Sequence, residues 1–143
     1  MKTFFFKATI LAVVTFFTIS CSKDDNSNTT EISGSSSSTT NTWVKLTATT
    51  STGVLKPNYI IMMFDQPVTS SASLPPIRKQ VTTDANGLAY FDLNAMITST
   101  TPTTYYFEAF ISNGSGGYIW KSISHPTFNI AKGQTTTSSI LVN

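Results

Sequence analysis

The chain has 143 residues, only 11% of them charged, and its 9 basic and 7 acidic side chains give a net charge of +2. Lys2 and Lys7 lie in an N-terminal segment that we expect to be removed, which leaves 9 − 2 = 7 basic against 7 acidic residues. A neutral mature chain without clustered Lys and Arg argues against a nucleic-acid partner.

The first twenty residues have the three parts of a secretory signal peptide. Lys2 and Lys7 form the basic start, residues 8–19 form an apolar run, and Ser20 is the small residue at the cleavage point. A helix of this apolar run would be about 18 Å long, which is short for a bilayer core of about 30 Å. We therefore predict a signal peptide at residues 1–20 and not a membrane-spanning anchor.

Cys21 is the single cysteine of the chain and follows the predicted cleavage point. A lone cysteine in a secreted protein has no disulfide partner and would be a free thiol. Thr18-Ile19-Ser20-Cys21 resembles the lipobox of bacterial lipoproteins, although Leu is commonest where Thr18 stands. The resemblance implies a diacylglycerol on the Cys21 sulfur and a further acyl chain, of the palmitate type, on the new amino terminus. Each buried methylene contributes roughly 0.8 kcal/mol to membrane binding, so we expect stable anchoring.

The next four residues are Ser22-Lys23-Asp24-Asp25. They resemble the signal that certain Gram-negative bacteria place after the lipidated cysteine to send lipoproteins to the outer face of the outer membrane. The resemblance implies an outer-membrane protein that faces the cell exterior. The alternative is an ordinary solvated charge cluster beside the lipid headgroups, which would leave the protein facing the periplasm.

Residues 21–42 continue as a segment rich in Ser, Thr and Asn, in which Ile32 is the one aliphatic side chain. So little apolar surface does not offset the entropy lost on ordering the chain. We predict a flexible tether, whose seventeen residues after Asp25 have a mean reach of about 20–25 Å.

Residues 43–143 show no helical periodicity. Short β-branched and aromatic runs alternate with Gly, Pro, Asn and Asp, as in all-β domains. We predict a single antiparallel β-sandwich of seven to eight strands. The expected strands are 43–50, 57–65, 77–83, 88–93, 104–112, 118–123, 127–131 and 136–142.

Two predicted hairpins carry most of the detail. Asn86-Gly87 is a hairpin signal because both residues accept positive φ, and the alternation after it buries Ala89, Phe91 and Leu93. In the second hairpin, a four-residue loop at 113–116 would place Glu108 opposite Lys121 and Ala109 opposite Trp120. The side chains that this register turns inward are Tyr105, Phe107, Ala109, Ile111, Tyr118 and Trp120.

The same register turns four apolar side chains outward, namely Tyr106, Phe110, Ile119 and Ile123. An exposed apolar patch on a monomer indicates a binding surface, so we consider these four residues a candidate patch for a glycan or a protein partner. The alternative is that the Ser- and Pro-rich loop 66–76 covers them.

Several of these stretches resemble the transthyretin-like (prealbumin-like) β-sandwiches, which include the carboxypeptidase regulatory-like domains. They are Tyr59-Ile60-Ile61-Met62-Met63-Phe64, residues 82–93 and Tyr105-Tyr106-Phe107. The resemblance covers essentially all of 43–143. It implies an accessory or adhesive module without catalysis of its own.

Side chains with catalytic or metal-binding chemistry are scarce. His125 is the single histidine and stands before Pro126, so it has no second histidine or cysteine for a zinc site or a nucleophile–base pair. Asp84-Ala85-Asn86-Gly87 lacks the later acidic ligands of a calcium loop. An isopeptide bond between Lys45 and Asn143, assisted by Glu108, would require burial of an acid that the predicted register turns outward.

The sequence therefore predicts no enzyme activity, no metal and no cofactor. We expect a membrane-anchored binding or adhesion module with a protein or glycan ligand. The alternatives are a glycan-binding accessory protein of an outer-membrane uptake system and a structural lipoprotein that faces the periplasm.

Overall fold

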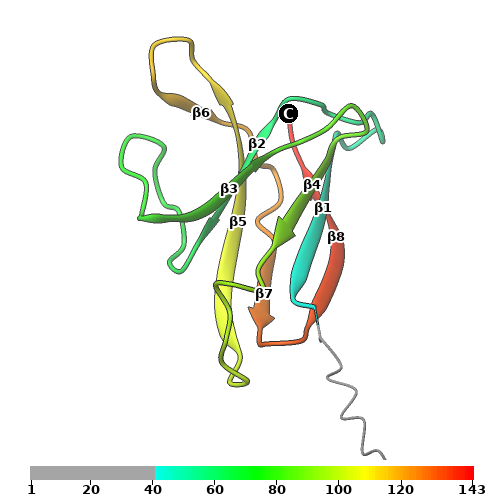
Figure 1. Ribbon diagram of the computed structural model, residues 1–143. Coiled ribbons are helices and arrows are strands. Elements are labelled where there is room, and N and C mark those ends of the chain that lie inside the picture. Colours follow the sequence, from blue (N-terminus) through cyan, green and yellow to red (C-terminus); the bar gives the residue numbers. More distant parts are fainter. Residues whose placement is uncertain (1–40) are drawn as a thin grey trace, which may run out of the picture. The chain divides into compact units, whose positions relative to one another are not determined.

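The computed structural model describes residues 41–143 (Figure 1). The predicted signal peptide, Cys21, the predicted export signal Ser22-Lys23-Asp24-Asp25 and the predicted tether up to residue 40 lie outside the described residues. The described part of the chain is all-β, and none of it forms a helix long and apolar enough to cross a membrane.

Eight strands form, as the alternation of β-branched and aromatic residues predicts. Every predicted strand is present, and no end differs from the prediction by more than three residues. The strands are β1 (Trp43–Thr49), β2 (Ile60–Phe64), β3 (Ile77–Thr82), β4 (Leu88–Asp92), β5 (Thr103–Ser112), β6 (Tyr118–Trp120), β7 (Thr127–Ile130) and β8 (Thr135–Leu141). Thr42, assigned to the tether, belongs to this domain because it is fully buried and its Oγ1 accepts a hydrogen bond from Gly133 N.

The strands form two sheets that face each other as a sandwich (Figure 1). One sheet has the order β4-β1-β8. The other has the order β3-β2-β5-β6, and β7 pairs with the first half of β5. The β1–β8 pair is parallel, whereas we expected antiparallel pairing throughout. Two parallel strands need a long connection between them. Here residues 50–134, which include the other six strands, connect β1 to β8.

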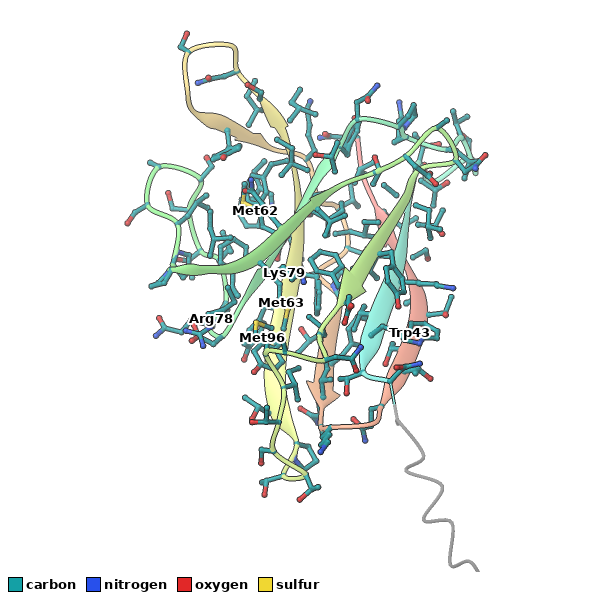
Figure 2. The ribbon with its side chains drawn as sticks, viewed as in Figure 1. Trp43, Met62, Met63, Arg78, Lys79 and Met96 are labelled. Atoms are coloured by element: carbon teal, nitrogen blue, oxygen red, sulfur yellow. The ribbon has the colours of Figure 1, made fainter. Side chains whose placement is uncertain are left out.

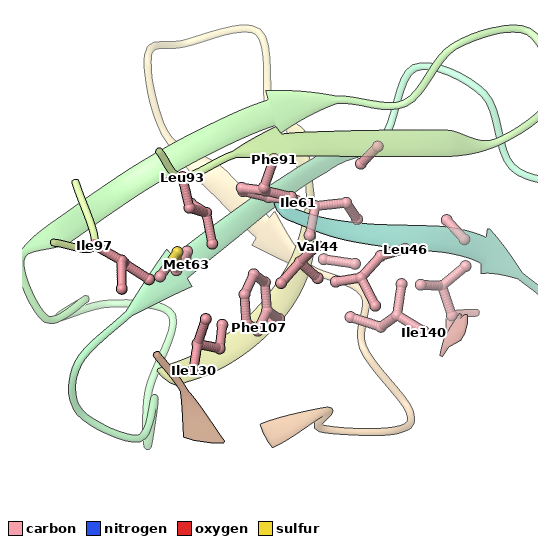
Figure 3. Packing of buried hydrophobic residues seen from close by; sticks show 14 residues of the cluster. Val44, Leu46, Ile61, Met63, Phe91, Leu93, Ile97, Phe107, Ile130 and Ile140 are labelled. Carbon is pink, nitrogen blue, oxygen red and sulfur yellow. The ribbon is translucent and has the colours of Figure 1, made fainter. Parts of the chain in front are cut away.

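The main core fills the space between the sheets (Figure 3). Val44 and Leu46 of β1 meet Ile61 and Met63 of β2, and all four side chains are fully buried. The predicted burial of Ala89, Phe91 and Leu93 is confirmed. The rings of Phe91 and Phe107 meet edge to face, with centroids 5.3 Å apart in one of the arrangements that aromatic pairs prefer.

The first predicted turn forms, but with a different geometry. Gly87 N donates to Asp84 O, Asp84 N donates to Leu88 O, and Gly87 has φ +70° whereas Asn86 does not have positive φ. This is a three-residue loop with a left-handed glycine, closed by Asp84 Oδ1, which accepts from Asn86 N and Leu88 N. Beyond the turn, β3 and β4 diverge into different sheets (Figure 1).

The predicted register of the β5–β6 hairpin is wrong by one residue. Phe110 lies opposite Trp120, so Glu108 is not opposite Lys121. The cause is a five-residue loop, because Asn113 N donates to Gly117 O and Asn113 Oδ1 accepts from Gly117 N. A slip of one residue reverses the face of every side chain on a strand. Tyr118 and Trp120 therefore pack on the outer face of the five-stranded sheet instead of the main core.

A second, smaller core lies on that outer face. Met62, Phe64 and Phe110 are fully buried there, and Val68 and Leu74 from the loop between β2 and β3 pack against them. The loop therefore covers the outward aromatic side chains, which was our alternative expectation. Covering them removes the apolar surface that β2 and β5 would otherwise expose to water.

Candidate binding face on the three-stranded sheet

The structure does not bring together the four residues of the predicted patch, and this corrects the sequence prediction. Phe110 is fully buried and Tyr106 is half-buried in the second core. Ile119 pairs with Ile111 and so faces the opposite side from Phe110, with 45% of its surface exposed. Ile123 is 53% exposed but lies beside β8, where its N–H donates to Leu141 O.

The outer face of the three-stranded sheet is a different candidate. The register of β1 with β4 and β8 aligns outward side chains in three rows of three residues. The rows are Asp92, Trp43 and Thr135; then Tyr90, Lys45 and Thr137; then Leu88, Thr47 and Ser139. We call these nine residues the outer grid. All nine are half-buried or exposed, and Trp43 lies on β1, away from Met62 and Met63 of β2 (Figure 2).

Two aromatic rings and one ammonium group occupy the centre of the outer grid. The ring centroids of Trp43 and Tyr90 are 6.0 Å apart and the rings are tilted by 41°. Lys45 Nζ lies 4.7 Å from the ring centroid of Trp43 and 5.6 Å from that of Tyr90. Both distances lie within the range of cation–π attraction, which holds the ammonium group over the rings.

The margins of the outer grid are polar. Thr135, Thr137 and Ser139 of β8 are exposed and present hydroxyl groups on one side. On the other side, Asp92 Oδ1 accepts hydrogen bonds from the backbone and side-chain N–H groups of Asn94. The face therefore combines aromatic rings, a central positive charge, hydroxyl groups on one margin and a carboxylate on the other.

The sequence alone does not reveal this face, for a physical reason. The alternation in Trp43-Val44-Lys45-Leu46 shows that Trp43 and Lys45 share a side of β1. Only the long-range pairing with β4 and β8 places Tyr90 and Thr137 beside them. The sequence does indicate that Trp43, Lys45 and Tyr90 lie on the outer faces of their strands, because each alternates with residues of the main core.

A second polar cluster surrounds Glu108 on the outer face of the other sheet. Glu108 points outward, as predicted, but it is only 3% exposed. Trp120 Nε1 donates to its Oε2 at 2.8 Å, and His125 Nδ1 lies 2.9 Å from Oε1 and 3.0 Å from Oε2. His125 is therefore oriented by a buried carboxylate, a contact that the sequence did not predict.

The Glu108 cluster has a structural role. Every buried side-chain nitrogen or oxygen atom in residues 41–143 has a hydrogen-bond partner, and Trp120 and His125 supply the partners of Glu108. The nearby Ser122 and Ser124 hydroxyls accept from Ala109 N and Leu141 N, so both are held by backbone groups. The carboxylate thus fixes the segment that joins β6 to β7.

Two further sequence hypotheses can be compared with the geometry. Lys45 lies on the outer face of the three-stranded sheet, whereas Glu108 lies on the outer face of the other sheet, so the arrangement does not support the isopeptide bond. The oxygen Oδ1 of Asp84 closes a hairpin turn. Among residues 41–143, no group of three His, Cys, Asp or Glu side chains could hold a metal ion.

Comparison with known proteins adds no family. The chain matches no protein-family model and no curated protein sequence.

Proposed function

We propose that this protein is a lipid-anchored, non-catalytic binding or adhesion module that is displayed on the outer face of the outer membrane. Cys21 would carry the lipid, Ser22-Lys23-Asp24-Asp25 would direct export, and the tether would hold the domain near the membrane. The resemblance to transthyretin-like modules supports a role in binding. The outer grid would be the surface that contacts the ligand.

One observation carries the binding role. Every other aromatic side chain of the eight strands belongs to or packs against the main core or the second core, whereas Trp43 and Tyr90 lie on an outer face, where Tyr90 is 44% exposed. Trp and Tyr side chains are enriched at recognition surfaces because they offer a large contact area and lose little conformational entropy when a ligand binds.

Display is tested by protease treatment of intact cells, with immunodetection of residues 43–143 and a Cys21→Ala control. Loss of the domain from intact wild-type cells is the expected result. Protection until the outer membrane is broken would contradict the export signal and favour a structural lipoprotein that faces the periplasm.

Binding is tested with the mature lipidated chain, extracted in detergent, on an array of neutral glycans, acidic glycans and extracellular-matrix proteins. We expect retention on at least one class and loss of retention in Tyr90→Ala. Ile119→Ala is the matched control, because Ile119 is 45% exposed on the other sheet. Retention that is unchanged in Tyr90→Ala would reject the outer grid as the binding surface.

A second candidate is a glycan-binding accessory protein of an outer-membrane uptake system. The aromatic pair beside a row of hydroxyl groups favours a sugar ligand, because a pyranose ring has one apolar C–H face and a polar edge. This candidate predicts retention on glycans alone in the same array.

A further inference from the structure

We infer that the ligand of the outer grid is an acidic polysaccharide of the hexuronate class, with a sugar ring against Trp43 and Tyr90 and its carboxylate paired with Lys45. The inference rests on the proposed function and names the substrate class of the same face. Three features of the outer grid support it: the positive charge of Lys45, the aromatic and hydroxyl side chains around Lys45, and the spacing of the strands.

The ammonium group of Lys45 has no acidic partner on the outer grid. Among residues 41–143, the basic side chains that contact a carboxylate are Arg78, beside Asp65, and His125, hydrogen-bonded to Glu108, so no carboxylate of the described residues pairs with Lys45. Asp92 keeps its negative charge at the β4 margin of the outer grid, one row from Lys45, but it forms no ion pair with Lys45, and its Oδ1 accepts from Asn94. Lys45 therefore presents a positive charge beside the rings of Trp43 and Tyr90, which suits an anionic group on the ligand.

The residues around this charge favour a sugar over a protein. The centre of a protein–protein interface is depleted of charged residues and is usually apolar, whereas Lys45 stands at the centre of the outer grid. Tyr90 and Thr137 flank it, and hydroxyl groups line the β8 side. A sugar has matching hydroxyl groups at its edge and C–H groups on its face.

A nucleic acid fits less well than an acidic sugar. Binding to a phosphate backbone requires several Lys or Arg side chains on one face, and Lys45 is the single basic residue of the outer grid. One cation beside two rings matches one carboxylate on one sugar ring.

The dimensions of a β-sheet agree with this assignment. Neighbouring strands are about 4.8 Å apart, and side chains on one face of a strand are about 6.8 Å apart. Trp43, Lys45 and Tyr90 therefore lie within reach of a single sugar residue. Thr137 and Ser139 lie one strand further, where the hydroxyl groups of the next sugar residue would be.

The test compares two lysine variants of the mature lipidated chain in detergent. Lys45→Gln removes the charge of the outer grid and keeps most of the side-chain stem. Lys121→Gln is the control, because this variant has the same net charge as Lys45→Gln. Lys121 lies just after β6 of the five-stranded sheet and is not part of the outer grid. The probes are polygalacturonate, alginate and hyaluronate, and fully methyl-esterified polygalacturonate serves as the uncharged counterpart of the first.

We expect wild type and Lys121→Gln to bind an acidic probe with similar affinity. Lys45→Gln should bind the same probe at least about tenfold more weakly, because it loses one charge-assisted contact. Methyl esterification should weaken wild-type binding by a similar factor. Equal loss in both variants would show non-specific attraction of a polyanion and would overturn the inference.

Failure of this inference can be distinguished from failure of the proposed function. Binding of neutral glycans or proteins that is lost in Tyr90→Ala and kept in Lys45→Gln would retain the binding face and reject the acidic ligand. Absence of binding to all three acidic probes would also reject the acidic ligand. Binding of any ligand that is insensitive to Tyr90→Ala would reject the face itself.

Discussion

The indole N–H of Trp120 donates a 2.8 Å hydrogen bond to Oε2 of Glu108. Trp120 of β6 lies opposite Phe110 of β5, one residue away from the expected position opposite Ala109. The one-residue difference in register brings Trp120 onto the face of the sheet from which Glu108 projects. A carboxylate that is almost completely buried thereby gains a donor that compensates for its loss of solvation.

Trp120→Phe should therefore lower the free energy of unfolding by about 1–3 kcal/mol, because the buried carboxylate loses a donor. Urea denaturation of the mature chain measures the change. Trp43→Phe is the control, since Trp43 lies on the outer grid and its cation–π contact with Lys45 contributes about 1 kcal/mol or less. Equal effects of the two substitutions would contradict the role assigned to the Trp120–Glu108 bond.

His125→Ala should destabilise the domain less than Trp120→Phe does. The His125 side chain is 55% exposed, so water can take part of its place beside Glu108, and a typical hydrogen bond contributes about 0.5–1.5 kcal/mol net. The effects of His125→Ala and Glu108→Gln should not add, because the two side chains contact each other. Arg78→Ala removes a different pair, with Asp65, and its effect should add to that of His125→Ala within about 0.5 kcal/mol. If the losses in the free energy of unfolding for His125→Ala and Glu108→Gln added in the double variant, measured by urea denaturation, the His125–Glu108 contact would be excluded.

Phe110→Ser should destabilise the domain by about 3–5 kcal/mol, the range for truncation of a buried phenylalanine. Phe110 is fully buried against Phe64 and Tyr118, so the substitution acts on stability and not on a binding patch. Ile119→Ser is the control and should change stability by less than about 0.5 kcal/mol, as exposed positions usually do. A cooperative, unshifted thermal transition of Phe110→Ser would show that the loop does not cover this side chain.

Gly87→Ala should destabilise the domain more than Gly114→Ala. Both glycines have positive φ, +70° and +77°, so a Cβ costs about 1–2 kcal/mol at either position. At Gly87 the added Cβ would also lie 2.8 Å from Ala48 O and 3.0 Å from Lys56 N, whereas nothing lies within 4 Å at Gly114. We expect about 1 kcal/mol or more of additional loss at Gly87. Equal losses, measured by urea denaturation, would contradict the close backbone approach.

The sequence by itself determined where the strands lie and, along β4, which residues are buried in the main core. Ala89, Phe91 and Leu93 could be assigned because alternation along one strand is a local property that follows from the pleat. The turn at Gly87 was predictable for the same reason, since a glycine between two strand patterns marks a residue that needs positive φ.

The tertiary structure alone decided which strands are neighbours and in which register. Alternation shows that Trp43 and Lys45 share a face, but it does not name the strands beside them. The parallel pairing of β1 with β8 joins the two ends of the domain, and the five-residue loop between Asn113 and Gly117 sets the register of β6. The outer grid and the burial of Phe110 both depend on contacts between distant segments, which the period of a single strand does not encode.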